Sequence, residues 1–197
     1  GLNGLTNLSQ IPVGTTTVLW TVTDANSNTN TCQQIVTVID TTKPTAVCAS
    51  PSVCLDASGN ATITVAQVNG GSFDNCGVLS TSISTSNFTC ANIGANAVTL
   101  VVTDSSGNVD SCVATITVLD TIFPSLTCPS NITVSNDFGI CGAVVNFSVS
   151  GTDNCSGVIV VSSVASGSTF PIGTTTVNDT ATDASGNASA TLTPGEK

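Results

Sequence analysis

The chain of 197 residues has no histidine, methionine, tyrosine or arginine, and it has only two lysines, one glutamate and one tryptophan. Without histidine, serine and cysteine nucleophiles lack their usual general base. Without a basic patch, nothing can neutralise the phosphates of a nucleic acid. The aspartates recur once per repeat at turn and linker positions, which favours an architectural role. The sequence therefore predicts neither an enzyme nor a nucleic-acid-binding protein.

Charged residues make up only 7% of the chain, whereas hydrophobic residues make up 40%. Valine, isoleucine, threonine and serine dominate, which favours strands over helices. The apolar residues alternate with polar ones, which predicts packed domains rather than disorder. Neither a signal peptide nor a transmembrane run is apparent, so we expect a mature or internal segment without membrane insertion. Nine cysteines without metal-type spacing indicate an oxidising, extracellular compartment.

The clearest pattern is an internal repeat of about 80 residues. A Thr-Asp turn motif occurs at 21–28, 101–108 and 180–187. Other landmarks recur in the same order: Cys32 and Cys112, Cys48 and Cys128, Asp40 and Asp120, Asp74-Asn75-Cys76 and Asp153-Asn154-Cys155. Boundaries are expected at the Asp-Thr-x-x-Pro segments, because proline stops one strand and sets up the next. This predicts a partial module at 1–40, a complete one at 41–120, and a third at 121–197 that lacks part of its last strand.

Each module shows the signals of short strands joined by tight turns. Residues 61–65 and 113–118 alternate with period two. Residues 104–108 are typical of a hairpin turn. Several such strands, with turn signals about every ten residues, predict an all-β chain of tandem antiparallel β-sandwiches.

The third module carries a family resemblance, in Asp120, Pro124, Cys128-Pro129, 153–155, 166–174 and 182–187. These residues resemble the hyalin-repeat (HYR) and related immunoglobulin-like repeats of bacterial extracellular surface and adhesion proteins. The middle module departs from the pattern, because 90–94 reads Cys-Ala-Asn-Ile-Gly where the family has Phe-Pro-x-Gly. The resemblance implies an extracellular, adhesion-associated, immunoglobulin-like sandwich with disulfides and no catalytic residues.

The family pattern and the closeness of first and last strands in a sandwich favour a Cys48–Cys112 disulfide. In the third module, the cysteine of the Asp-Asn-Cys corner has only Cys141 available, which predicts Cys141–Cys155. In the middle module, Cys76 has two candidate partners, Cys90 and Cys54. We favour Cys76–Cys90, because alternation places Cys54 on the outward side of its strand.

Cys32, Cys54 and Cys128 then remain unassigned. Cys32 is a last-strand cysteine and Cys128 a first-strand cysteine, so the two are complementary halves of one bridge. One interpretation is an intermolecular Cys32–Cys128 disulfide between chains that polymerise head to tail by sharing a strand. The other is a longer array whose further modules supply both partners. The partner of Cys54 is left open.

Calcium is the candidate metal, because hard cations prefer carboxylate and carbonyl oxygens. The candidate ligands are the acidic and amide residues of the repeat: Asp104 with Asn108, Asp183 with Asn187, Asp74, Asp153, Asp40 and Asp120. Aspartate and asparagine are also preferred turn formers that bond their own backbone. A turn role therefore stands as the alternative.

Covalent glycans are a further expectation. Eight Asn-x-Ser/Thr sequons are present, at Asn7, Asn60, Asn87, Asn131, Asn146, Asn154, Asn178 and Asn187. Thr41, Thr121 and Thr180 follow an aspartate in segments that resemble the Asp-Ser/Thr-apolar O-glycosylation signal of some gliding bacteria. The alternative is that Asp-Thr is a strand-ending turn.

The sequence thus predicts an extracellular structural repeat protein that self-assembles into a stalk or fibre at a cell surface. A ligand- or glycan-binding adhesin is the alternative. Glycan binding usually needs an exposed aromatic platform, and Trp20 lies in the apolar run 18–20, where we expect it to pack in the core.

Overall fold

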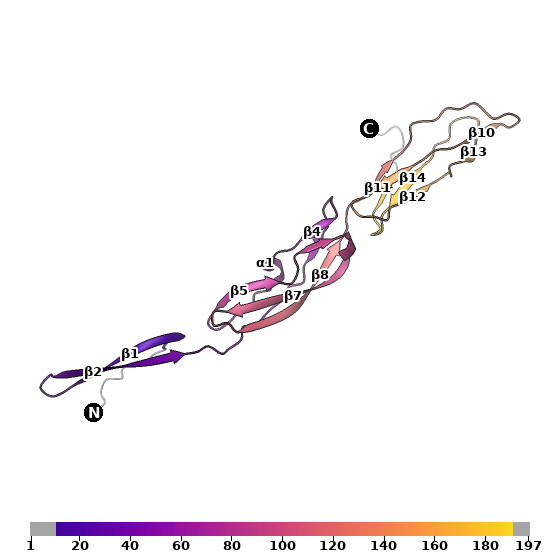
Figure 1. The fold of residues 1–197 in the computed structure, drawn as a ribbon. Helices are drawn as coiled ribbons and strands as arrows, with labels where there is room; N and C mark the ends of the chain where they lie inside the picture. The colour runs from indigo at the N-terminus through magenta and orange to yellow at the C-terminus, as the bar shows by residue number, and fades with distance from the viewer. Residues whose placement is uncertain (1–10, 191–197) are drawn as a thin grey trace. The chain divides into compact units, whose positions relative to one another are not determined.

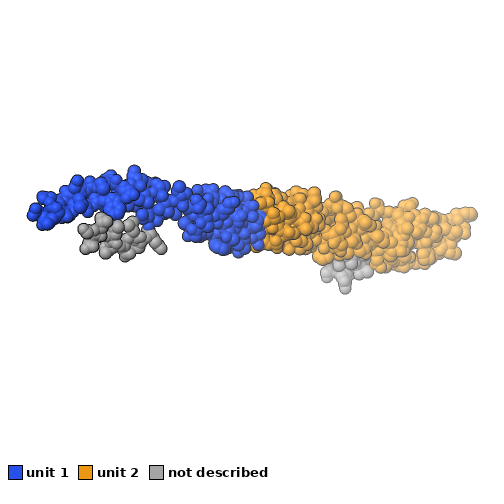
Figure 2. Space-filling model, turned by 90° about the horizontal axis from the view of Figure 1, so that it is seen from below, with its two compact units in different colours: residues 1–48, 69–82, 100–112 blue, residues 49–68, 83–99, 113–197 orange. Residues whose placement is uncertain are grey.

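The computed structural model describes residues 11–190. It falls into two compact units, one of residues 1–48, 69–82 and 100–112, and one of residues 49–68, 83–99 and 113–197 (Figure 2). These units do not follow the repeat, because both draw on the expected middle module. The module boundaries at 40 and 120 remain a prediction.

The first described element is a long antiparallel hairpin of β1 (Gly14–Thr23) and β2 (Thr29–Val38) (Figure 1). Its register is continuous from Gly14 opposite Val38 to Thr23 opposite Thr29. Most of its side chains are exposed, those at Trp20 and Cys32 included. The Trp20 indole donates a hydrogen bond to Gln34 Oε1 at 2.9 Å. The prediction that Trp20 packs in a core is therefore wrong for this chain.

A four-stranded sheet follows, in the order β3-β8-β7-β5. Its strands are β3 (Ser52–Cys54), β5 (Val78–Ile83), β7 (Gly94–Asp104) and β8 (Val109–Leu119). A second pair, β4 (Asn60–Thr62) and β6 (Asn87–Thr89), is antiparallel. Two short helices accompany these strands, α1 (Val65–Val68) and a 3-10 turn at Cys90–Asn92. The β3–β8 pair is parallel, whereas the other registered strand pairs of the described residues are antiparallel.

The main core lies on β7 and β8. Alternate residues of both strands are fully buried: Val98, Leu100, Val102, Ala114, Ile116 and Val118. They are joined by Leu55, Ile63, Val68 and Phe88, each at most 3% exposed. Burial follows the period-two pattern at 113–118, so the alternation identified β8. At 61–65 only Ala61 and Thr62 lie in a strand, β4, and Val65 begins α1. The expected all-β class with disulfides is confirmed.

The remaining strands form three small sheets. They are β9 (Ser125–Thr127) with β11 (Ser150–Thr152), β10 (Gly142–Val145) with β13 (Ser168–Pro171), and β12 (Ile159–Ser162) with β14 (Asp179–Thr182) and β15 (Ala188–Ala190). Small residues let these strands pack closely. A Cβ atom at Gly151 would lie 2.7 Å from Val158 Cγ1 and 3.0 Å from Val160 Cγ2, so only glycine fits there.

Candidate cation clusters and disulfides

Two disulfides are present. Cys48 and Cys112 are bridged with their Cα atoms 6.0 Å apart, as the sequence predicted. Cys48 lies in an isolated bridge with Asn69, and Cys112 lies in β8. The bridge closes a span of 64 residues, so it removes many conformations from the unfolded chain.

The second bridge joins Cys90 to Cys155, with 5.6 Å between their Cα atoms. The expected pairs Cys76–Cys90 and Cys141–Cys155 are therefore wrong, and Cys76 and Cys141 are free and exposed. Cys76 precedes β5 and Cys90 follows β6. Because Cys90 and Cys155 are bonded to each other, neither is available to the partner that the sequence predicted for it.

The bridge links an Asp-Asn-Cys corner to a cysteine of the preceding repeat. Both residues belong to the same compact unit. Gly59 leaves room for the bridge, because a Cβ atom there would lie 2.7 Å from Cys90 Sγ and 2.9 Å from the Asn154 carbonyl oxygen. The sequence did contain a signal: Cys90 stands where the middle module departs from the family pattern. The expected pairs, in contrast, each join two cysteines of one repeat.

Five cysteines remain free and exposed: Cys32, Cys54, Cys76, Cys128 and Cys141. Although Cys128 as a whole is exposed, partial desolvation of its sulfur, together with the Asp179 carboxylate at 3.9 Å, raises the pKa of its thiol. Burial also raises the pKa of the Cys76 thiol, with further contributions from Asp40, Asp74 and Asp104. Both thiols therefore keep their proton to a higher pH than an ordinary cysteine.

One turn occurs three times. In each copy an aspartate Oδ1 accepts backbone hydrogen bonds from the residues two and four positions later, and its Oδ2 accepts from the amide nitrogen of the asparagine at the fourth position. The three pairs are Asp24 with Asn28, Asp104 with Asn108, and Asp183 with Asn187. At Asp104 and Asp183 burial opposes ionisation, but these hydrogen bonds outweigh it and lower the pKa. At Asp24 the hydrogen bonds from Asn28 lower the pKa.

Asn108 and Asn187, which we expected to be calcium ligands, make hydrogen bonds to the linkers instead. Asn108 Nδ2 also donates to the carbonyl oxygens of Asp40 and Thr42, at 3.2 and 3.0 Å. Asn187 Nδ2 donates to the carbonyl oxygen of Asp120 at 3.2 Å. Each asparagine side chain therefore links its turn to the linker by hydrogen bonds. Its Nδ2 group, which cannot bind a cation, faces the linker aspartate.

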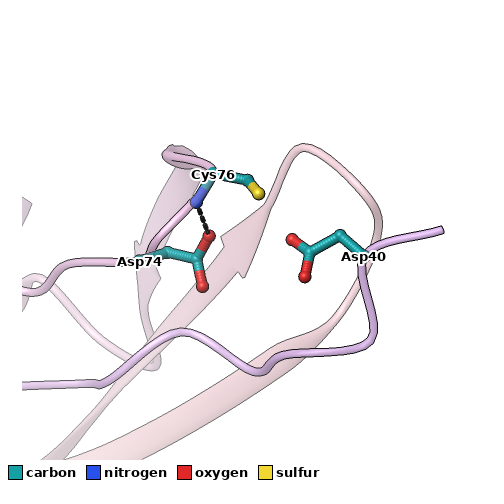
Figure 3. Close-up of side chains that lie close together, drawn as sticks. All are labelled: Asp40, Asp74 and Cys76. Carbon is teal, nitrogen blue, oxygen red and sulfur yellow. Dashed lines mark hydrogen bonds between the residues drawn. The ribbon is translucent and has the colours of Figure 1, made fainter. Parts of the chain in front are cut away.

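Each linker aspartate lies in a cluster of possible metal ligands. Asp40, Asp74 and Cys76 each place one ligand atom within 4.8 Å of the others, and so do Asp120, Asp153 and Asp183. Figure 3 shows the carboxylates of Asp40 and Asp74 pointing toward one another. The two clusters occupy equivalent repeat positions, since Asp40 corresponds to Asp120 and Asp74 to Asp153.

The predicted O-glycosylation residues are accessible. Thr41, Thr121 and Thr180 are all exposed, the last of them in β14. Among the sequons, Asn60, Asn87, Asn131, Asn146 and Asn178 are exposed, whereas Asn154 and Asn187 are half-buried. Asn7 lies outside the described residues.

Comparison with known proteins gives three likenesses. Residues 119–193 match the model of the HYR domain. The chain is 33% identical over 191 residues to hyalin of the sea urchin Strongylocentrotus purpuratus, a match that covers 91% of this chain and 16% of hyalin. Among solved structures, extracellular cadherin domains 1–4 of protocadherin gamma B7 align with a TM-score of 0.38 at 17% identity, over 90% of this chain and 56% of that one.

The first two matches support the HYR family. The bacterial setting that the resemblance implied is not supported, because the matched relative is a sea-urchin protein. None of the helices in the described residues is long and apolar enough to cross a membrane.

Proposed function

We propose that this chain is an extracellular, non-enzymatic repeat protein of adhesion type, which forms a stalk or fibre by completing its open strands with those of another copy. The observation that carries the proposal is the bare hairpin β1–β2. Trp20 is 37% exposed and Val22 is 68% exposed, although both lie on the same face of a long, regularly paired strand. An apolar sheet face of this kind is stabilised when another strand or sheet covers it.

The free cysteines support the same arrangement. Cys32 lies in β2 opposite Trp20, and Cys128 directly follows β9. Both are exposed and unbridged. They occupy the repeat positions of Cys112 and Cys48, which form a disulfide in the middle repeat. In the proposed assembly, Cys32 of one chain therefore forms a disulfide with Cys128 of the next. The oxidising extracellular compartment takes up the two electrons and two protons that the thiols lose.

Mass spectrometry of a non-reducing digest of the assembled native material tests this pairing. We expect a cross-linked peptide that contains Cys32 and Cys128. The matched variants are Cys32→Ser and Cys54→Ser, because both remove an exposed, unbridged thiol from a strand. Fibres in negative-stain images should be lost or shortened in the first variant and kept in the second. Cys32 joined to a sequence absent from this chain would overturn strand sharing in favour of a longer array.

Covalent glycans are part of the proposal. Thr41 and Thr121 are exposed and follow buried aspartates in equivalent linkers. With few charges on the chain, attached sugars would also help to keep its surface soluble. Intact-mass measurement of native material should exceed the 19.5 kDa of the bare chain, and peptide mapping should place the added mass at these threonines. A bare mass would rule glycosylation out.

A further inference from the structure

We propose that the chain binds two calcium ions in equivalent sites, one at Asp40 and Asp74 and the other at Asp120, Asp153 and Asp183. The proposal is independent of fibre formation, because each site lies within one compact unit of a single chain. Oxygen atoms that share one Ca²⁺ at its usual bond lengths lie at most about 5 Å apart. The ligand atoms of each cluster meet this limit, since they lie within 4.8 Å of one another.

Both sites leave the same oxygens without a partner. Each linker aspartate accepts a backbone hydrogen bond at Oδ1 from the residue two positions later, Thr42 for Asp40 and Ile122 for Asp120. In both copies Oδ2 is buried and has no hydrogen bond. Asp40 is 8% exposed and Asp120 is 7% exposed, so these oxygens are also shielded from water.

The corner aspartates show the complementary arrangement. Asp74 accepts at Oδ2 from the Cys76 backbone at 2.7 Å, and Asp153 accepts at Oδ2 from the Cys155 backbone at 3.2 Å. In both copies it is Oδ1 that is buried without a partner. A buried, unsatisfied carboxylate oxygen is costly unless a cation or donor compensates it. The same unpartnered oxygens recur in two repeats, which indicates one kind of compensating group for both sites.

No side chain of the described residues can supply that positive charge at the second site. The sequence has no arginine or histidine, and its lysines are Lys43 and Lys197. The described part of the second unit, which holds Asp120, Asp153 and Asp183, therefore contains no cationic side chain. Three carboxylates at this separation repel one another strongly in a partly buried setting. A divalent cation from solution removes both the repulsion and the unsatisfied oxygens.

The donor set selects a hard cation. The second cluster is made of carboxylates alone, and the nearby Cys155 sulfur is held in its disulfide. Asn154 adds a buried, unpartnered Oδ1, and its Nδ2 donates to Asp120 Oδ1 at 3.3 Å. Oxygen donors in irregular, protein-built arrangements are typical of Ca²⁺, whereas Mg²⁺ demands a tighter octahedron and keeps more of its water.

The test is calcium titration of the full chain by isothermal calorimetry after chelator treatment, with Ca²⁺ as the only added metal. We expect two ions per native chain, and one in Asp153→Asn, which keeps the size of the side chain and removes a ligand charge. The matched control is Asp24→Asn. Asp24 makes the same turn bonds as Asp183 but belongs to neither cluster, so this variant should still bind two ions.

Thermal melting of the native chain gives a second readout that needs no variant. Because an ion that binds only the folded state stabilises it, saturating Ca²⁺ should raise the Tm by several degrees over the chelated sample. Absence of calcium uptake at millimolar concentration, or two ions still bound by Asp153→Asn, would overturn the proposal. Loss of an ion in Asp24→Asn would instead assign binding to the repeated turn and would equally reject the two clusters.

Discussion

Strands β1 and β7 hold the same repeat positions, 80 residues apart, and they can be compared residue by residue. In β7, Leu100 and Val102 are fully buried. Their equivalents in β1 are Trp20, which is 37% exposed, and Val22, which is 68% exposed. Both strands are paired in long hairpins, and both hairpins close with the same Asp-Asn turn.

The difference lies in what covers the strands. In the middle repeat, further apolar residues outside the sheet that contains β7, such as Ile63, Val68 and Phe88, are buried. No described residue plays that role for β1. Alternation and turn chemistry are local properties that suffice to form a hairpin, whereas burial depends on a second layer. A strand can therefore be fully paired without being part of a packed module, and the two properties need different sequence features.

The largest expected difference is between Cys112→Ser and Cys32→Ser. Cys112 forms the Cys48 bridge, so its removal should lower the free energy of unfolding by about 2–5 kcal/mol. Cys32 occupies the equivalent position but is unbridged, so its removal should change the stability of the isolated chain by less than about 0.5 kcal/mol. Urea denaturation under non-reducing conditions measures both. Equal effects would mean that the Cys48–Cys112 bridge does not form in solution.

A second matched pair tests packing. Val102→Ala removes two buried methyl groups and should cost about 2–3 kcal/mol once the cavity is included. Val22→Ala makes the same change on the exposed strand and should cost less than about 0.5 kcal/mol in the isolated chain. Equilibrium unfolding of both variants measures the two losses in the free energy of unfolding. If assembly covers β1, the cost of Val22→Ala should rise toward that of Val102→Ala in assembled material.

The fold was predictable because its signals are local and repeated. The alternation at 113–118 located β8, whose Ala114, Ile116 and Val118 are buried, and the turn at 104–108 has the expected aspartate-centred bonds. The Cys48–Cys112 bridge was expected from the family pattern together with the closeness of the first and last strands in a sandwich. These features need no knowledge of how one repeat meets another.

The errors share the opposite cause. Cys90–Cys155 joins different repeats, and no spacing rule within one repeat could produce it. The prediction that Trp20 packs in a core rests on the apolar residues of its strand. A strand's own sequence, however, does not show whether another layer covers that strand. The acidic clusters were only partly predictable. All of their aspartates are among the expected calcium ligands, but the sequence does not show which of them lie together. Nor does it show that Asn108 and Asn187 bind the carbonyl groups of Asp40 and Asp120.

Low pH should reduce stability more through the turn at Asp104 than through the equivalent turn at Asp24. The pKa of Asp104 is lowered in the folded state, so its ionised form stabilises the fold above the unfolded pKa of about 4. That contribution is lost as the pH falls through the lower, folded-state pKa. We expect the urea midpoint to fall between pH 5 and pH 3 by less in Asp104→Asn than in the native chain. In Asp24→Asn the urea midpoint should change with pH as it does in the native chain, because the turn of Asp24 belongs to the exposed hairpin. A different dependence on pH would show that the hairpin unfolds together with the core.

The smallest expected effect concerns the rate at which the proposed Cys32–Cys128 bridge forms. Burial and the Asp179 carboxylate raise the pKa of Cys128, so less of its reactive thiolate is present near neutral pH. Alkylation of Cys128 by iodoacetamide, followed by peptide mapping, should therefore become faster in Asp179→Asn, with Cys32 in the same sample as the internal reference. Circular dichroism of the variant checks that its strands are retained. An unchanged Cys128-to-Cys32 ratio would show that Asp179 does not control this thiol. A raised ratio would show that the Asp179 carboxylate slows the reaction of the Cys128 thiol, as its raised pKa predicts.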